Sequence, residues 1–285
     1  MAISKRSAER AFSGLKRLLP IIQQQKTRDV SEADTVTIVK DVMDEVFGFD
    51  KYTEVTSEHA IRGTYCDVAV RIEEKLIELV EIKSAGTTLD DRHVKQAIDY
   101  AANEGVVWVV LTNGSVWRLY EVLFAKPIDK RLLIEVDLTT LDLKRDESVN
   151  CLSPFMREGF VKGVQEELRD RQDATSRYLL GALILNNDNV IGAIRRELRR
   201  VVDVLVDDEE ILKVLRSEVI KRETMDGPEA EVAVKRINRI GSKNSRLKAA
   251  SQASPEASQN IKSADGQPLD STPCEGTANA EKSPL

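Results

Sequence analysis

The chain has 285 residues, of which 32% are charged and 41% hydrophobic, and its net charge at pH 7 is −6. This composition is typical of a globular protein with one or two cored domains, and no apolar run reaches the roughly 18 residues of a membrane span. The acidic balance disfavours a protein that coats nucleic acid, although a local basic patch can still bind phosphates. Three scattered cysteines are too few for a disulfide framework or a zinc site, which favours a reduced, cytoplasmic setting.

The chain opens with two helical patterns. Residues 7–25 carry apolar side chains at helical spacing and predict an amphipathic helix, which Pro20 should break or kink. Ser31 has the position of an N-cap before a second helix, with Asp34 in the capping-box position and Gly48 as the stop.

Two alternating, β-branched runs at 65–72 and 76–83 predict a β-hairpin with a three-residue loop. With that loop, the antiparallel register places Asp67 directly opposite Glu81. Lys83 lies two residues beyond Glu81 and therefore points to the same face of the sheet. The hairpin is thus expected to gather two carboxylates and one ammonium.

Carboxylates facing each other at about 5 Å between Cβ atoms repel, so a stable sheet should avoid the pair unless positive charge lies between them. A divalent cation would supply that charge. Oxygen ligands suit Mg²⁺ or Mn²⁺ better than zinc, for which His or Cys ligands are the rule. The alternative is a salt-bridge cluster on the wet face of an antiparallel sheet.

The remaining patterns complete an α/β domain. Asn113-Gly114 is a strong hairpin signal between two further strand-like runs. Together with the flanking helical patterns, these runs predict a mixed sheet flanked by helices. The other expected elements are a strand at 52–58, a helix at 89–103, strands at 106–111 and 116–122, and an edge strand at 132–138.

From Ser153 to Arg239 only helical patterns follow, and after residue 240 the Ser-, Ala-, Lys- and Pro-rich composition predicts disorder. The apolar stripes of these helices exceed what one pair of short helices needs, so we expect them to pack on each other and to offer a surface for a homodimer. The stripes comprise Ile191, Ile194, Leu198, Val201, Val202, Leu205, Ile211, Leu212 and Leu215. The expected division is an N-terminal helix at 1–30, an α/β domain at 31–145, an all-α domain at 151–240 and a disordered tail at 241–285.

The order Asp67-x13-Glu81-Ile82-Lys83, followed by Gln96-x3-Tyr100, resembles the PD-(D/E)XK nuclease superfamily. More narrowly, the chain is similar over about residues 30–125 to the N-terminal nuclease domain of type I restriction enzyme R subunits. Further similar stretches are Ser31–Thr35, Phe47–Phe49, and Leu111–Gly114 followed by Trp117 and Tyr120. Cys66 departs from the proline that many members have before the aspartate.

The resemblance implies a restriction-endonuclease-like fold and a Mg²⁺-dependent (or Mn²⁺-dependent) DNA endonuclease. Asp67, Glu81 and the backbone carbonyl of Ile82 would be the metal ligands, with Glu32 as a further carboxylate. Lys83 would hold the attacking water or neutralise charge that develops on the phosphate. Glu32 has a simpler alternative role, since an acidic residue at a helix start stabilises the helix dipole.

The resemblance also places Gln96 and Tyr100 beside the metal centre, in contact with DNA. The alternative is an amphipathic helix whose tyrosine packs on the sheet. Trp117 and Tyr120 suggest base stacking, but hairpin aromatics are more often core residues. A basic cluster in the helical part is either a second DNA contact or a solvated face; it comprises Arg195, Arg196, Arg199 and Arg200.

The sequence contains no G-x-x-x-x-G-K-[ST] loop, so we expect no nucleoside triphosphate partner and a stand-alone nuclease domain without a helicase motor. DNA is the expected partner, RNA stays open, and no membrane partner is expected. The competing hypothesis is a non-catalytic nucleic-acid-binding or partner-docking module that retains the nuclease fold.

Overall fold

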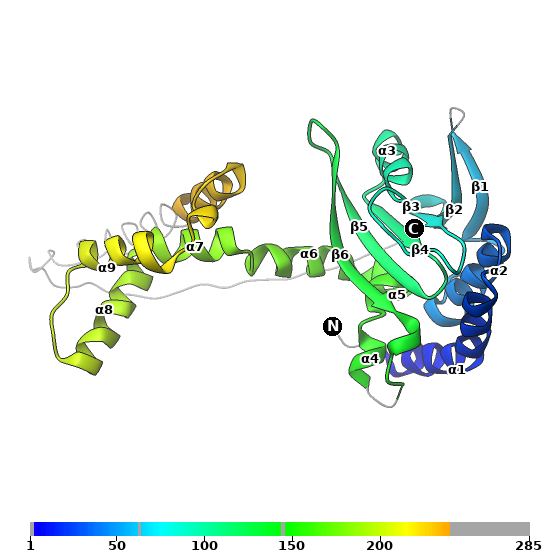
Figure 1. Ribbon diagram of the computed structural model, residues 1–285, viewed down its shortest axis with the longest axis horizontal. Helices are drawn as coiled ribbons and strands as arrows, with labels where there is room; N and C mark the ends of the chain where they lie inside the picture. Colours follow the sequence, from blue (N-terminus) through cyan, green and yellow to red (C-terminus); the bar gives the residue numbers. More distant parts are fainter. Residues whose placement is uncertain (1–2, 62–63, 144–145, 240–285) are drawn as a thin grey trace, which may run out of the picture. The chain divides into compact units, whose positions relative to one another are not determined.

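A six-stranded mixed sheet organises the first part of the chain in the computed structural model, which describes residues 3–61, 64–143 and 146–239 (Figure 1). The strands lie in chain order across the sheet, and only β3 and β4 run parallel. Helix α3 (Lys95–Glu104) connects these two strands, as a parallel crossover requires. The strands are β1 (Val55–Ile61), β2 (Thr64–Ile72), β3 (Lys75–Ile82), β4 (Trp108–Thr112), β5 (Val116–Leu123) and β6 (Asp129–Asp137). The expected mixed sheet flanked by helices is confirmed.

Helices cover both faces of this sheet (Figure 1). On one face, α1 (Lys5–Arg28) and α2 (Glu32–Val42) share an apolar core with strand residues such as Val68, Val80 and Ile82. On the other face, α3 packs on strand residues such as Leu79 and Leu111. The two cores leave little of the central strands exposed, because β3 and β4 are buried from both sides.

The N-terminal helices follow their sequence signals, with one correction. Ser31 caps α2, since its hydroxyl accepts the N–H of Asp34 at 3.2 Å, and after a π-helical turn (Met43–Phe47) Gly48 ends the segment at φ 84°. Of the break or kink expected at Pro20, the break is wrong, because α1 continues through Pro20 from Lys5 to Arg28. Pro20 lies on the exposed side of α1, where water can solvate the carbonyl that loses its partner.

The first hairpin differs from expectation in its turn but not in the strand positions that carry the site. The loop is the two-residue Glu73-Glu74, and both residues have positive φ, 50° and 63°. The pairing Ile72↔Lys75 is therefore offset by one residue from the expected pairing. An irregularity between Val70 and Arg71 absorbs the offset, as a β-bulge does, so Val68 pairs with Val80 in the expected register.

Other bounds shift by a few residues. Helix α3 starts at Lys95 rather than near residue 89, because turns precede it in which the Asp90 carboxylate accepts the N–H of Arg92 at 2.8 Å. Trp117 and Tyr120 are buried, as the core interpretation predicted. The Trp117 ring lies edge-on to Phe47, with ring centroids 4.7 Å apart, and its Nε1 donates to Gly114 O. They are therefore not positioned to stack on bases.

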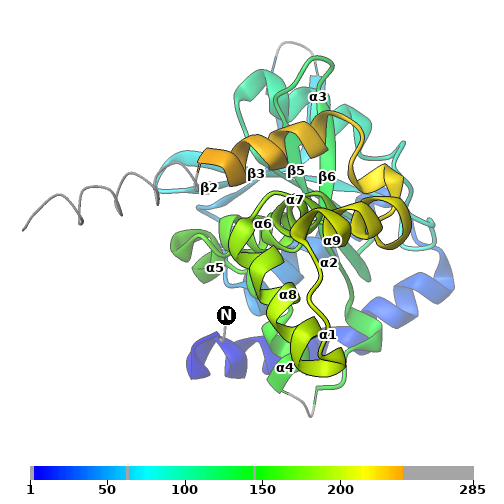
Figure 2. The same ribbon diagram turned by 90° about the vertical axis from the view of Figure 1, so that its left-hand side faces the viewer.

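The first compact unit extends to Leu180 rather than ending near residue 145. Phe155 stacks on Phe47 at 5.7 Å between centroids, and Glu158 receives two hydrogen bonds from Arg10, so the segment after residue 150 belongs to the core of this unit. The α1 helix belongs to the same core, and α4 lies beside it (Figure 2). The helices of this segment are α4 (Asp146–Asn150), α5 (Arg157–Lys162) and α6 (Val164–Ala174), with 3-10 turns at Leu138–Thr140 and Ser153–Phe155.

The second unit starts at Gly181 and is helical in its described part, in agreement with the sequence. Its helices are α7 (Arg177–Leu185, which crosses the division), α8 (Asp188–Val202), α9 (Asp208–Val214) with a π-helical turn (Leu215–Val219), a 3-10 turn (Arg222–Thr224) and a helical stretch at 228–239. No helix in the described ranges is both long and apolar enough to cross a membrane. The expected tail at 241–285 lies outside the described residues.

Candidate active site

The paired ends of β2 and β3 bring Asp67 and Glu81 together. Val68 pairs with Val80, so one further step in the same register sets Asp67 opposite Glu81. Oδ2 of Asp67 accepts a hydrogen bond from the backbone N–H of Ile82 at 2.6 Å, which fixes the carboxylate against β3. The two strands thus hold both acidic groups at one place at the end of the hairpin.

Lys83 completes this group immediately after β3. Its Nζ lies 2.7 Å from Glu81 Oε1 and 3.5 Å from Glu32 Oε2, at the start of α2. Its backbone N–H donates to Thr112 O at 2.8 Å, which extends the parallel pairing of β3 and β4 by one residue. We call Glu32, Asp67, Glu81 and Lys83 the Lys83 cluster; it contains every acidic ligand and the lysine that the sequence predicted.

The Lys83 cluster is not a solvated surface salt bridge. The Glu81 side chain is only 10% exposed and that of Lys83 21%, whereas Glu32 is 48% exposed at the rim. Two carboxylates therefore contact one ammonium, the charge of Asp67 also acts on that ammonium, and two of the four side chains are largely withdrawn from water. When all four are ionised, the cluster retains an excess of negative charge.

Burial, hydrogen bonding and neighbouring charges all shift the pKa values of Glu81 and Lys83. Burial raises the pKa of the Glu81 carboxyl, and the neighbouring Asp67 raises it further, although Lys83 opposes this by hydrogen bonding. Burial lowers the pKa of the Lys83 ammonium, but its hydrogen bond to Glu81 and the charges of Glu81, Glu32 and Asp67 outweigh burial and raise it. The site therefore favours a protonated lysine and attracts positive charge.

The donor set fits a small, hard cation bound through few protein ligands. Mg²⁺ commonly uses one or two carboxylates and keeps several water ligands, and Asp67 and Glu81 provide such a pair. Within the described ranges, no group of three or more His, Cys, Asp or Glu side chains is close enough to enclose a metal ion. A cation here would thus depend on the two strand carboxylates, the Ile82 carbonyl and water, with Glu32 at the rim.

A residue whose role the sequence did not reveal holds the loop after Lys83. Asn113 is buried in the β4–β5 turn, and its Nδ2 donates to Thr87 O at 2.9 Å. Its Oδ1 accepts the N–H groups of Ser115 and Val116 at 3.1 and 2.8 Å. The Asn-Gly signal predicted the turn, but not the bond to a loop 26 residues earlier in the chain.

Helix α3 exposes the Gln96 side chain and buries that of Tyr100. Gln96 is exposed, whereas Tyr100 is buried against the sheet, where burial raises its pKa to about 12. Both line a hollow of about 380 Å³ whose rim carries the cations Arg92 and Lys95. Gln96 is therefore accessible to a ligand on the outer side of α3, while Tyr100 acts mainly in packing.

The Cys66 thiol and a hollow beside α1 are less suited to catalysis than the Lys83 cluster. Burial raises the pKa of the Cys66 thiol to about 12, so this neighbour of Asp67 is no thiolate nucleophile at neutral pH.

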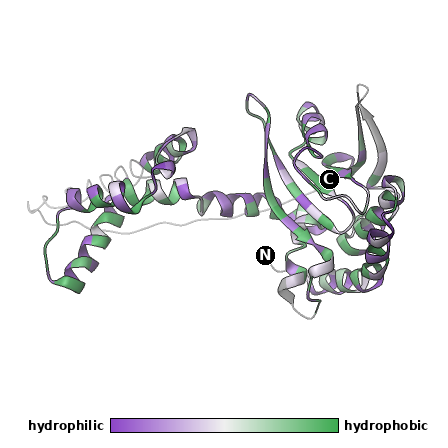
Figure 3. Ribbon diagram, viewed as in Figure 1, coloured by the Kyte–Doolittle hydropathy of each residue, from purple (hydrophilic) through white to green (hydrophobic). Residues whose placement is uncertain are grey.

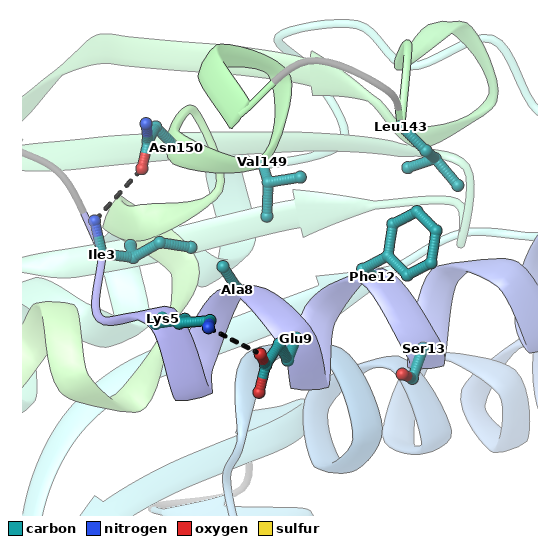
Figure 4. Close-up of a pocket in the computed structure, with 9 residues that line it drawn as sticks. All are labelled: Ile3, Lys5, Ala8, Glu9, Phe12, Ser13, Leu143, Val149 and Asn150. Carbon is teal, nitrogen blue, oxygen red and sulfur yellow. Dashed lines mark hydrogen bonds and ion pairs between the residues drawn. The ribbon is translucent and has the colours of Figure 1, made fainter.

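A separate hollow of about 680 Å³ lies between α1 and the segment around Val149 (Figure 4). Its polar groups are engaged locally, as the Lys5–Glu9 pair at 4.0 Å and the Asn150 side chain on the Ile3 N–H show. This hollow lacks convergent reactive groups.

No protein-family model matches this chain, and no curated protein or solved structure matches it either. The functional interpretation therefore depends on the Lys83 cluster and on the physical chemistry of its arrangement.

Proposed function

We propose that this protein is a Mg²⁺- or Mn²⁺-dependent endonuclease that hydrolyses phosphodiester bonds in DNA, on a restriction-endonuclease-like fold. The observation that carries the proposal is the charge of the Lys83 cluster, where three carboxylates meet one ammonium and Glu81 is nearly buried. Such an arrangement costs stability unless a cation joins it, and buried groups with shifted pKa values of this kind cluster at active sites.

Each member of the cluster has a distinct role in the proposed reaction. Asp67, Glu81 and the Ile82 carbonyl would hold the cation, which when bound polarises a phosphate oxygen and lowers the pKa of a water. The Lys83 ammonium orients the attacking water or neutralises the charge that develops on the phosphate. The ion pair with Glu81 holds the Lys83 ammonium beside the proposed positions of the water and the phosphate before the substrate binds.

DNA would approach from the side of α3, where Gln96 is exposed beside Arg92 and Lys95. Cations at such a rim bind phosphates without reading sequence, whereas an amide can read base edges. The sequence provides no phosphate-cradling loop for a nucleotide-driven motor, so the proposed activity is cleavage without translocation.

Incubation of the purified protein with supercoiled plasmid, with and without Mg²⁺, tests the proposal directly. We expect nicked or linear product only with the metal, and none with Asp67→Ala. Asp129→Ala is the matched control, because this exposed aspartate at the start of β6 lies outside both the Lys83 cluster and the hollow on α3. Equal cleavage by the wild type and Asp67→Ala, or none by the wild type under any metal, would reject the proposal; parallel assays with RNA identify the preferred polymer.

One observation favours the alternative of a non-catalytic nucleic-acid-binding or partner-docking module. The Lys83–Glu81 ion pair already compensates one buried carboxylate, and no metal-enclosing group of three ligands occurs in the described part of the chain. In that case DNA would bind equally well with and without divalent metal. Binding measured by fluorescence anisotropy in EDTA and in Mn²⁺ separates the two functions.

A further inference from the structure

Helix α8 carries apolar and basic side chains on opposite sides, and Figure 3 shows hydrophobic and hydrophilic residues alternating along it. The apolar side buries Ile191 at the start of the helix, whereas Val201 near its end is 75% exposed. The expectation that the apolar stripes pack on each other therefore holds for the first half of α8 only. The basic side is exposed along the second half of the helix.

The basic side is one helix face rather than a run of scattered charges. Arg196 and Arg200 follow Ile191 by five and nine residues, which places them about 140° and 180° round the helix from it. Nη1 of Arg196 lies 3.8 Å from the position that a Cβ of Gly192 would take, so this side chain lies back along the same face. The arginine face comprises Asn189, Gly192, Ala193, Arg196, Arg199 and Arg200, none of which is acidic.

Two of these arginines have no counter-charge. Arg196 and Arg199 form no ion pair with the described residues. Arg200 pairs with Glu197 at 2.7 Å, but both side chains are more than half exposed, so this pair contributes little. Like charges three and four residues apart on a helix repel each other. An anionic partner that binds several of the arginines would remove this repulsion.

A nucleic-acid backbone suits the closeness of these charges better than an acidic protein segment does. Arg196, Arg199 and Arg200 lie within roughly 6 Å along the helix axis. Duplex DNA carries one charge per about 1.7 Å of its axis, so several phosphates fall within that length. In an extended acidic segment the side chains on one side are about 7 Å apart, so one carboxylate would serve all three arginines. Guanidinium groups also bind phosphate oxygens in a bidentate manner.

An anionic membrane does not fit the arginine face. A helix that lies on a membrane inserts its apolar side into the interface and turns the opposite side towards water. Arg196 and Arg200 would then point away from the lipid headgroups. A partner that contacts these arginines must approach from the side of α8 that the apolar residues do not occupy.

The first unit offers DNA few cations beside its candidate site. Of the two cations that line the hollow on α3, Arg92 is already paired with Asp90 at 2.6 Å, which leaves Lys95. The Lys83 cluster has an excess of negative charge, and the whole chain has a net charge of −6. Phosphates are therefore repelled overall unless a separate basic surface binds them.

We propose that the arginine face of α8 is this surface, a second DNA contact that binds backbone phosphates without reading sequence. The identity of the polymer as DNA rests on the proposed function. A long polymer can contact both units at once, and two linked contacts strengthen each other because binding at one raises the effective concentration at the other.

Fluorescence anisotropy of the full chain with a labelled DNA duplex in EDTA, over about 50 to 200 mM salt, tests the surface. EDTA removes any contact that a metal mediates at the Lys83 cluster. Arg196→Ala/Arg199→Ala should bind roughly tenfold or more weakly, and the slope of log Kd against log salt should fall by about two, because two phosphate contacts are lost. A wild type that does not bind the duplex overturns the proposal.

Lys213→Ala/Arg216→Ala is the matched control, because it removes two exposed cations at the same spacing in the same unit. It causes the same change in net charge and should bind DNA as the wild type does. Equal losses of affinity in the two double variants would show that net charge, not the arginine face, governs binding, and would overturn the proposal.

A substitution that should strengthen the helix separates a lost contact from a lost fold. Gly192→Glu places a carboxylate four residues before Arg196, where opposite charges pair and stabilise a helix, and the position has room for a side chain. We expect DNA binding to weaken about fivefold, with an unchanged or higher melting temperature, because Arg196 is neutralised. Gly192→Gln has the same size without the charge and should bind as the wild type does. Equal binding by the two variants would overturn the contact at Arg196.

The surface and the nuclease function can fail separately, since anisotropy measures binding and the plasmid assay measures cleavage. Binding that depends on Arg196 and Arg199, without cleavage under any metal, would reject the nuclease and support the surface. Cleavage of plasmid by a wild type whose DNA binding does not depend on these arginines would reject the surface alone. If Arg196→Ala/Arg199→Ala keeps DNA binding but loses co-sedimentation with vesicles containing phosphatidylserine, the arginines bind a membrane and the proposal is overturned.

Discussion

The Asp67 carboxylate is bound by the peptide that separates Glu81 from Lys83, because its Oδ2 accepts the Ile82 N–H at 2.6 Å. The contact crosses from β2 to β3 and needs only an acceptor oxygen, not a charge. A mutation can therefore remove the charge of this side chain and keep its position, since asparagine can accept the same hydrogen bond without the negative charge.

Asp67→Asn should consequently fold normally but lose the metal response. We expect Mg²⁺ or Mn²⁺ to raise the melting temperature of the wild type and to leave that of Asp67→Asn unchanged. In EDTA the variant should be as stable as the wild type or slightly more so, because repulsion with Glu81 is removed. Differential scanning calorimetry measures both effects, and equal metal shifts in the two proteins would contradict a metal site at Asp67.

Lys83→Ala should abolish cleavage while metal binding persists. The ammonium acts on water and phosphate rather than on the cation, so we expect a loss of about a hundredfold or more in rate. The control is Lys75→Ala, at the exposed start of the same strand. Single-turnover rates with saturating Mn²⁺ give the effect on chemistry, and calorimetric titration with Mn²⁺ gives the binding. A variant that cuts at the wild-type rate would remove Lys83 from the mechanism.

The position of the cluster could be predicted from the sequence, although the turn at the other end of the same hairpin could not. The alternation of β2 and β3 fixes which residues face which core, since Val68 and Val80 pack under α1 and α2 whereas Ala69 and Leu79 pack under α3, and a slip of one residue would exchange the two faces of a strand. The turn carries two glutamates at positive φ, where Gly or Asn is usual, so its residues gave no signal for a two-residue loop.

Contacts between distant segments were beyond the sequence patterns. Nothing local indicates that Phe155 stacks on Phe47 or that Glu158 binds Arg10, and the α/β domain was therefore expected to end near residue 145. A chain shortened near residue 150 would lose these contacts. The second compact unit begins only at Gly181.

Asn113→Asp should slow cleavage by loosening the loop after Lys83. Aspartate keeps the acceptor for Ser115 and Val116 but has no donor for Thr87 O, which it would instead repel. We expect a drop of roughly tenfold in the single-turnover rate with little change in KM, because positioning rather than binding is affected. Hydrogen exchange should become faster in residues 84–87. A lower melting temperature with an unchanged rate would limit Asn113 to a structural role.

Acid should weaken the attachment of α5 to α1. Burial tends to raise the pKa of Glu158, but its paired hydrogen bonds from Arg10 outweigh this and lower that pKa to about 2. The carboxylate therefore stabilises the fold above its unfolded pKa of 4.5, and the contribution is lost as pH falls from there towards 2. Because the pair is partly exposed, Glu158→Gln should cost about 1–2 kcal/mol at pH 7 and little near pH 2. Urea unfolding at both pH values measures the difference.

Replacing two buried glutamates of the sheet by glutamine, one at a time, should change the stability of the protein in different directions. Glu121 on β5 is paired with Arg131, whose Nε lies 2.9 Å away, and with Arg169 at 3.6 Å. Glu78 on β3 lies between Val70 and Trp108, has no ion-pair partner in the described part of the chain, and burial raises its pKa well above the usual value. Glu121→Gln should therefore destabilise the protein, whereas Glu78→Gln should be neutral or stabilising at pH 7.

The direction in which Glu78 changes stability with pH follows from the protons that the folded and unfolded states bind. The folded state keeps its carboxyl protonated at pH values where the unfolded chain has released the proton, so stability falls as pH rises above 4.5. Glu78→Gln removes this dependence, and its unfolding free energy should decline less than that of the wild type between pH 5 and pH 8. Parallel slopes for wild type and variant would show that Glu78 ionises in the folded protein and that an unseen partner compensates it.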